Sequence, residues 1–268
     1  MFRKIRNAII HPRKTLYTAL VRLQQQTCGF FQGTPFFMQG QMDIHQKSRW
    51  HNPHFIKLTG GFFLNDDSQQ RRIYDLEAWD NTRRDMLILL LRSIIERNIY
   101  GELAELGVYK GHTARLIHHY MPERNLYLFD TFEGFTDRSV KSEQGHTNST
   151  ISPLHFSDTT LDAVKCYVSA QNNNVKFYKG FFPDSIPDTL ESTRFAFVHL
   201  DADLYEPILN GLKYFYPKMH PGGMIIIHDY NAWPGARKAV DDFFVGKTEA
   251  PIPMPDKSGS ALIVINSH

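Results

Sequence analysis

Residues 102–120 read ELAELGVYKGHTARLIHHY, and this stretch indicates the fold class. Glu102–Leu106 has the apolar and β-forming composition of a short strand, and His112–Tyr120 has the residue pattern of a helix. Gly107 and Gly111 bracket the turn between them, where glycine allows a tight bend and lets a ligand lie against bare backbone. A strand followed by a tight turn and a helix is expected in an α/β protein.

The alternation of strand and helix continues to the end of the chain. Further strands are predicted at Leu126–Phe129, Val175–Tyr178, Phe195–Leu200, Met224–Ile227 and Leu262–Ile265, and further helices at Leu161–Ala170, Glu206–Tyr216 and Ala236–Phe244. Upstream, apolar residues recur at helical spacing from Leu76 to Asn98, which predicts a longer helix. Because the strands are nearly continuous apolar runs, we predict a doubly wound α/β fold with a mainly parallel sheet. Ligands of such sheets bind at the carboxyl ends of the strands.

Length and composition are those of an ordinary globular protein. The 268 residues, 42% of them hydrophobic and 22% charged, argue against disorder as the main state. A formal net charge of +2 argues against a dedicated nucleic-acid-binding protein. Cys28 and Cys166 cannot build a disulfide framework or a CxxC site, so the cytoplasm is the expected compartment. No apolar run reaches the roughly 18 residues of a transmembrane helix.

The amino-terminal part of the chain has a different character. Its first acidic residue, Asp43, is preceded by six basic residues: Arg3, Lys4, Arg6, Arg13, Lys14 and Arg22. Apolar residues between them predict an amphipathic helix broken at Pro12, which would pack on the domain or on another subunit of a homo-oligomer, or attach to an anionic membrane. The aromatic and glycine-rich stretch that follows is expected to be a loop or lid. We therefore divide the chain into an extension, residues 1–75, and a ligand-binding domain, residues 76–268.

Acidic residues end the first two strands of this domain. Glu105 would repel a pyrophosphate but attract a cationic group, and the phosphate-binding pattern G-x-G-x-x-G is absent from the turn after it. Asp130 follows 25 residues later, about the interval at which a carboxylate binds ribose hydroxyls, although capping of the next turn is an alternative role. A ribose, a cationic group and no phosphate pattern together suggest S-adenosylmethionine.

Four ionisable residues follow the strands Phe195–Leu200 and Met224–Ile227: Asp201, Asp203, His228 and Asp229. These strands are neighbours in a doubly wound sheet, so the four side chains should converge at one rim. Such a cluster is either a metal site or an acid/base cluster. Carboxylates of like charge destabilise one another, so we expect a cation or a proton between them. Capping of the following helix by Asp201 and Asp203 is the alternative.

The motifs of this domain resemble those of the macrocin O-methyltransferase family. The resemblance extends from about residue 76 to the end of the chain and rests on residues 105–111, 128–135, 200–207, 221–223, 228–230 and 235–243, in the order and spacing of the family. It implies a class I S-adenosylmethionine-dependent methyltransferase with a Rossmann-like, seven-stranded sheet. The resemblance further implies that the substrate is a sugar hydroxyl and that a divalent metal, usually magnesium, takes part.

The resemblance also implies roles for individual residues. Glu105, Gly107 and Gly111 match the loop that binds the methionine part of the cofactor, and Asp130 matches the ribose ligand. Asp201 matches the first metal carboxylate, and Asp203 stands where these enzymes have their candidate general base. The polar segment Asp137–Ser157 is a candidate lid over this rim, or an ordinary surface connection.

One position departs from the family pattern. The family ends its fifth strand with two aspartates, whereas this chain has His228 and Asp229. An imidazole in place of a carboxylate removes a hard ligand, which weakens the case for magnesium relative to a softer ion or no ion, although magnesium remains the first expectation. His228 is also an alternative base, because its ordinary pKa of about 6.5 suits proton transfer at neutral pH.

Two functions therefore stay open. The first is a sugar O-methyltransferase in which Asp201, Asp229 and His228 surround a metal and Asp203 or His228 is the base. The second is a catalytically silent or regulatory S-adenosylmethionine-binding protein that has lost the metal site.

Overall fold

The computed structural model describes residues 80–147, 151–169 and 173–266. The predicted basic arm, the aromatic lid and the boundary at residue 75 lie outside these residues. Within the described ranges, no helix combines the length and the apolar character that crossing a membrane requires.

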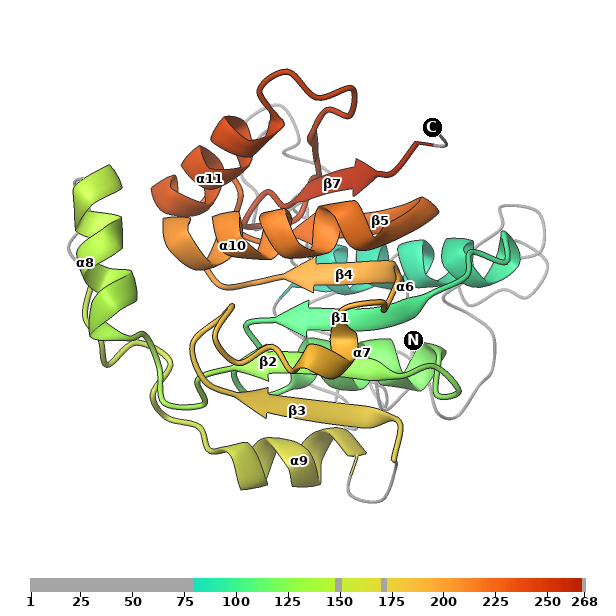
Figure 1. The fold of residues 1–268 in the computed structure, drawn as a ribbon, viewed down its shortest axis with the longest axis horizontal. Helices are drawn as coiled ribbons and strands as arrows, with labels where there is room; N and C mark the ends of the chain where they lie inside the picture. Colours follow the sequence, from blue (N-terminus) through green and yellow to red (C-terminus); the bar gives the residue numbers. More distant parts are fainter. Residues whose placement is uncertain (1–79, 148–150, 170–172, 267–268) are drawn as a thin grey trace, which may run out of the picture. The chain divides into compact units, whose positions relative to one another are not determined.

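A seven-stranded sheet forms the centre of the domain, in the order β3-β2-β1-β4-β5-β7-β6 (Figure 1). Its strands are β1 (Glu102–Leu106), β2 (Leu126–Asp130), β3 (Val175–Lys179), β4 (Phe195–Leu200), β5 (Met219–Ile227), β6 (Ile252–Pro253) and β7 (Ala261–Val264). Strands β1 to β5 are parallel, while β7 is antiparallel to both β5 and β6. The predicted doubly wound α/β fold is thus confirmed, with the reversal of strand order between β1 and β4.

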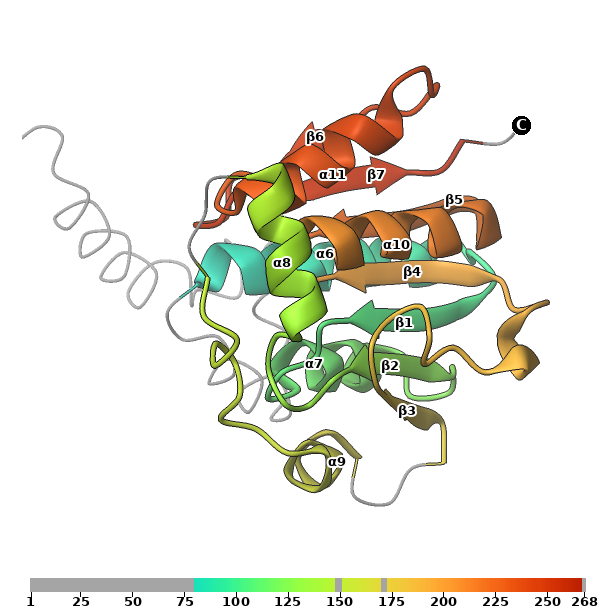
Figure 2. The ribbon, with the colours of Figure 1, turned by 60° about the vertical axis from the view of Figure 1, so that its left-hand side comes forward.

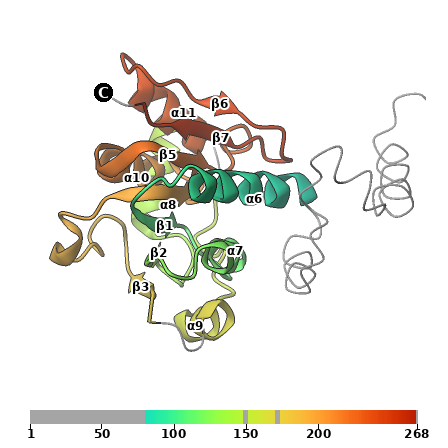
Figure 3. The ribbon, with the colours of Figure 1, turned by 90° about the vertical axis from the view of Figure 1, so that its right-hand side faces the viewer.

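Helices cover both faces of the sheet. Three helices, α6 (Asn81–Glu96), α7 (His112–Tyr120) and α9 (Leu161–Ser169), lie on one face, and α10 (Tyr205–Phe215) and α11 (Pro234–Phe244) lie on the other (Figure 3). Two short 3-10 turns, η2 (Asp188–Leu190) and η3 (Tyr216–Lys218), complete the connections. The helix expected from Leu76 begins at Asn81, because the Asp80 side chain accepts a hydrogen bond from the Arg83 amide as its N-cap.

Strand β4 lies at the centre of the sheet and is buried on both faces. Every residue of β4 is buried, as expected for a central parallel strand whose two faces are covered. Phe195, Val198 and Leu200 belong to a core cluster that also contains residues of α10 and α11. His199 is the polar exception within this strand, and its partner is described below.

The ends of the parallel strands bring the predicted site residues to one edge. Backbone hydrogen bonds continue past the strand ends, from the Asp201 amide to the Leu106 carbonyl and from the His228 amide to the Leu200 carbonyl, each at 2.8 Å. Gly107 has a φ of +87°, and a Cβ there would overlap the Asp201 carbonyl. Only glycine lets the β1 turn approach the end of β4 this closely.

Helix α8 (Asp137–His146) lies within the segment that the sequence predicted as a polar lid or surface connection. It stands apart from both layers of helices, across the carboxyl-end edge of the sheet (Figure 2). Its polar sequence lacks the long apolar stripe of the other helices, so hydrophobic spacing did not reveal it. The Thr136 side chain begins the helix by accepting a hydrogen bond from the Ser139 amide at 3.1 Å.

Candidate active site

A cavity of about 590 Å³ opens at the carboxyl edge of the sheet, where the strand order reverses between β1 and β4. All of the predicted site residues except one line this cavity: Glu105, Gly107, Asp130, Asp201, Asp203, His228 and Asp229. The exception is Gly111, which is the N-cap of α7 with a φ of +82°. A Cβ at Gly111 would come within 2.6 Å of the Val168 side chain, so this glycine allows α9 to pack against the turn.

Asp130 fixes the turn after β1. One carboxylate oxygen accepts hydrogen bonds from the amides of Val108 and Tyr109, at 2.6 and 2.9 Å, and the other accepts from the Phe132 amide at 2.6 Å. Turn capping, the alternative role given to this residue, is therefore present. The Thr131 hydroxyl also lies 3.4 Å from Oδ1 of Asp130, but it donates at 2.6 Å to the Gly134 carbonyl. A carboxylate has about four acceptor positions, so the three amide bonds leave room for a hydroxyl donor. Ribose binding by Asp130 stays a prediction.

Glu105 forms a buried pair with His199 on the neighbouring strand. The two residues stand opposite each other in the register of β1 and β4, and their Oε1 and Nδ1 atoms are 2.9 Å apart. Burial lowers the pKa of His199 to about 3, so its imidazole is neutral and Nδ1–H donates to the carboxylate. His199 holds the Glu105 side chain in one orientation at the cavity wall. Sequence reasoning missed it, although a histidine inside a continuous apolar strand was a usable signal.

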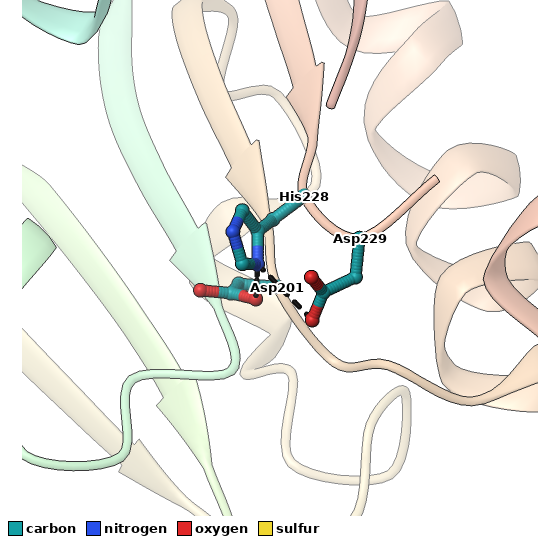
Figure 4. A group of neighbouring side chains, drawn as sticks. All are labelled: Asp201, His228 and Asp229. Atoms are coloured by element: carbon teal, nitrogen blue, oxygen red, sulfur yellow. Dashed lines mark hydrogen bonds and ion pairs between the residues drawn. The ribbon is translucent and has the colours of Figure 1, made fainter. Parts of the chain in front are cut away.

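Asp201 lies between two positively charged side chains, His228 (Figure 4) and Arg83. Its Oδ1 is 2.7 Å from Nδ1 of His228, and its Oδ2 is 2.7 Å from Nη2 of Arg83. Burial opposes ionisation of Asp201, but the charges of His228 and Arg83 outweigh it and hold the pKa of the carboxyl well below its usual range. Arg83 also donates to the Thr113 hydroxyl at 3.1 Å. Arg83 belongs to α6. Its place in the site is visible only in the folded structure, because no sequence pattern distinguishes it.

His228 bridges Asp201 and Asp229. Its Nδ1 also lies 3.2 Å from Oδ2 of Asp229. Burial lowers the pKa of His228, but the charge of Asp201 and the hydrogen bonds to both aspartates raise it to about 9. The bridging nitrogen therefore carries a proton at neutral pH. The other ring nitrogen, Nε2, is buried and makes no hydrogen bond within the described part of the chain.

Asp203 and Asp229 share a proton. Burial, the charge of Asp201 and a hydrogen bond to Asp229 raise the pKa of Asp203 well above its usual value. Burial opposes ionisation of Asp229, but hydrogen bonds from His228 and Asp203 lower its pKa. Asp203 is thus the donor and Asp229 the acceptor. Both residues have left-handed backbone angles, with φ of +58° and +57°, a conformation that is unusual outside glycine and often found at functional sites.

The donor set of this cluster fits a divalent metal. Asp201, His228 and Asp229 each offer one ligand atom, and these atoms all lie within 4.8 Å of one another. Two carboxylate oxygens and one imidazole nitrogen suit an ion such as manganese or zinc better than magnesium, which prefers oxygen ligands. Binding through Nδ1 requires the proton on His228 to leave.

Aromatic rings form another wall of the cavity. Phe135 makes edge-to-face contacts with Phe156 and with Trp233, at centroid distances of 5.3 and 6.0 Å, and Tyr109 contacts Phe156 at 5.1 Å. The predicted lid segment contributes Ser139 and Phe156 to the lining. An apolar ring face beside an acid cluster suits a ligand with both apolar and hydroxyl surfaces.

Sequence comparison finds O-methyltransferases among the relatives of this chain. The chain is 29% identical over 165 residues to demethyldecarbamoylnovobiocin O-methyltransferase of Streptomyces niveus, covering 57% of this chain and 62% of that protein. It is 30% identical over 173 residues to the 8-demethyl-8-(2,3-dimethoxy-alpha-L-rhamnosyl)-tetracenomycin-C 4'-O-methyltransferase of Streptomyces olivaceus, covering 60% and 64%. Mycinamicin III 3''-O-methyltransferase of Micromonospora griseorubida is 28% identical over 167 residues, with 57% and 64% covered. The matches thus span somewhat less than two thirds of these relatives.

Two solved structures share the fold. The O-methyltransferase NovP superposes with a TM-score of 0.62 at 22% identity, covering 69% of this chain and 80% of that one. The calicheamicin methyltransferase CalS11 gives a TM-score of 0.54 at 18% identity, covering 88% and 95%. The family model of macrocin-O-methyltransferase (TylF) matches residues 79–261. Because that match covers most of the chain, the protein belongs to the macrocin-O-methyltransferase family.

Proposed function

We propose that the protein transfers the methyl group of S-adenosylmethionine to a hydroxyl group of a sugar in a glycoside. The observation that carries the proposal is the cavity at the β1–β4 edge, which joins a glycine turn and two acidic strand ends to a cluster of acid/base groups. The three relatives are named O-methyltransferases, and the name of one includes a rhamnosyl group.

The residues of the β1 turn fit the cofactor. Glu105 would attract its ammonium group, Gly107 would give the methionine part access to the backbone, and Asp130 would accept a hydrogen bond from a ribose hydroxyl. Bound there, S-adenosylmethionine supplies a methyl group on a positively charged sulfur, which makes the carbon open to attack by an oxygen.

The acid cluster would activate the acceptor. A sugar hydroxyl is a poor nucleophile until its proton leaves, so a base must lie next to it. Asp203 and His228 are the two candidates at the cavity wall, and each must first lose the proton that it holds in the described state. Aromatic contacts from Phe135 and Trp233 would orient the acceptor. Holding the acceptor oxygen in line with the methyl group lowers the activation barrier by roughly several kcal/mol.

A divalent ion would complete the cluster. Asp201, His228 and Asp229 would hold it, and its positive charge would lower the pKa of a neighbouring hydroxyl and displace protons from His228 and Asp203. The imidazole ligand of His228 makes manganese or zinc a better fit than magnesium.

The test is methyl transfer from labelled S-adenosylmethionine to a panel of glycosides that begins with p-nitrophenyl α-L-rhamnopyranoside. We expect transfer that chelation abolishes and added manganese restores. Asp203→Asn then tests the base, because loss of turnover with unchanged affinity for cofactor and manganese assigns the proton transfer to Asp203. Full turnover of Asp203→Asn assigns it to His228, since His228→Asn would lose turnover as a metal ligand in either case. Transfer that continues in excess chelator would refute the metal role.

The second candidate is an S-adenosylmethionine-binding protein without turnover. The observation in its favour is that Arg83 and His228 already neutralise Asp201 from within the chain. Cofactor binding with no methyl transfer to any glycoside of the panel would favour this candidate.

A further inference from the structure

Glu143 on α8 is a fully buried carboxylate. It lies at the point where the first turns of α10 and α11 meet. Oε2 accepts a hydrogen bond from the Tyr205 amide, the first residue of α10, at 2.8 Å. Oε1 accepts one from the Thr147 hydroxyl at 2.9 Å. An unpaired buried carboxylate would be strongly destabilising, so these hydrogen bonds indicate a specific contact between α8 and α10.

The carboxylate also lies against the first turn of α11. Gly235 is the second residue of that helix, and a Cβ there would overlap both carboxylate oxygens of Glu143. The N-cap residues of the two helices are Leu204 and Trp233, whose side chains cannot accept a hydrogen bond. The amino-terminal ends of both helices carry partial positive charge, and the anionic side chain of α8 compensates it.

These two helices follow the two loops of the acid cluster. Helix α10 begins directly after Asp201 and Asp203, and α11 begins shortly after His228 and Asp229. Figure 1 shows α8 beside the left-hand ends of α10 and α11. Helix α8 also brings Ser139 and its N-cap residue Thr136 to the cavity wall. A second contact supports this docking, since the His146 ring stacks on the Tyr205 ring at a centroid distance of 3.8 Å.

We propose that Glu143 is a positioning residue of the active site: it fastens α8 to the first turns of α10 and α11 and so fixes the acceptor side of the cavity. The cofactor side, formed by the β1 turn and Asp130, is held by separate hydrogen bonds. Loss of the Glu143 contact therefore affects acceptor binding more than cofactor binding. The contact itself follows from the geometry, whereas its effect on an acceptor rests on the proposed function.

The test is a double-mutant cycle between Glu143→Ala and Gly235→Ala. Gly235 is in a helix and its φ is not left-handed, so alanine strains no backbone there and only its Cβ meets the carboxylate. In the parent protein we expect Gly235→Ala to speed amide hydrogen exchange of residues 137–147 about tenfold or more. In the Glu143→Ala background the space is free, so adding Gly235→Ala should cause no further increase.

The matched controls are Gln144→Ala and Gly145→Ala, exposed positions of the same helix, the second with open space around its Cα. Neither should speed the exchange of α8, and Gly145→Ala should slow it, because alanine stabilises a helix relative to glycine. Affinity for S-adenosylhomocysteine, measured by calorimetry, should stay within about twofold in all variants, while KM for p-nitrophenyl α-L-rhamnopyranoside rises about tenfold in Glu143→Ala. Glu143→Gln, which keeps the acceptor oxygen, should recover part of the KM.

The outcomes separate the two proposals. Additive exchange effects, or an unchanged α8 in Gly235→Ala, would overturn the role of Glu143. Faster exchange throughout the sheet with loss of S-adenosylhomocysteine binding would show general unfolding and would overturn it as well. If the parent protein binds no S-adenosylhomocysteine or methylates no glycoside, the proposed function fails, but the exchange cycle still decides the contact.

Discussion

Metal binding at the acid cluster should depend steeply on pH because His228 holds a proton where the metal would bind. Nδ1 of His228 lies 2.7 Å from Asp201 and 3.2 Å from Asp229, and its pKa is raised to about 9. At pH 7 this nitrogen is about two pH units below its pKa. Displacing its proton then costs about 3 kcal/mol, which weakens the apparent metal affinity about 100-fold relative to the fully deprotonated site.

The assay is a calorimetric titration of manganese into metal-free protein between about pH 6.5 and 8.5 under argon. We expect the affinity to rise about tenfold per pH unit through loss of the His228 proton. Titrations in buffers of different ionisation enthalpy count the protons released, and at least one per metal is expected. The Asp203 proton would add to this number if it also leaves.

The matched variant is His228→Asp, which replaces the protonated imidazole with the carboxylate typical of the family. It should release one proton fewer, lose the corresponding pH dependence and prefer magnesium, because the site then offers oxygen ligands. Manganese binding to the parent protein without proton release and with the same affinity at every pH would refute the reasoning. Absence of any metal binding across the range would refute the metal site itself.

Three further predictions concern single residues. Asp130→Ala should weaken S-adenosylmethionine binding by about 1 to 3 kcal/mol in calorimetry, because a charged acceptor for the ribose and for the β1 turn is lost, and an unchanged affinity would contradict its role. Asp203→Asn keeps a donor toward Asp229 but cannot accept a proton, so its turnover should fall about 100-fold or more if Asp203 is the base, and full activity would remove Asp203 from the mechanism. His199 has a pKa of about 3 in the fold against about 6.5 unfolded, so the unfolded chain binds more protons below pH 6.5 and stability should fall as pH decreases from 6.5 toward 3. Urea unfolding of His199→Gln should lack this contribution, and an identical pH slope in parent and variant would contradict the neutral imidazole.

The strand ends were predictable because they follow from local patterns. Strand β4 is apolar except for His199, and Asp201 and Asp203 follow it closely, so hydrophobicity predicts both the strand and the edge where its acids lie. The same reasoning applies to Glu105 at the end of β1 and to His228 after β5. Parallel strands then bring these residues together whatever the loops between them do.

Contacts between distant segments were not predictable in this way. Arg83 reaches Asp201 across 118 residues, and nothing in the spacing of α6 distinguishes it from the arginine beside it. Glu143 lies in a polar stretch whose helix depends on a cap and on docking against α10 and α11. Gly111 was assigned to the cofactor loop by resemblance, which stays a prediction, and its contact with Val168 of α9 was not predicted. Such roles depend on which surfaces meet, and hydrophobic spacing along the chain does not report that.

The most direct measurement is a calorimetric titration of S-adenosylmethionine into the full-length protein, with and without chelator. A site at the β1–β4 edge predicts one cofactor per chain, displacement by S-adenosylhomocysteine, and an affinity that chelation leaves within about twofold, because the β1 turn and the acid cluster are separate parts of the cavity. If S-adenosylmethionine does not bind under either condition, the cavity is not a cofactor site and the proposed methyl transfer is contradicted.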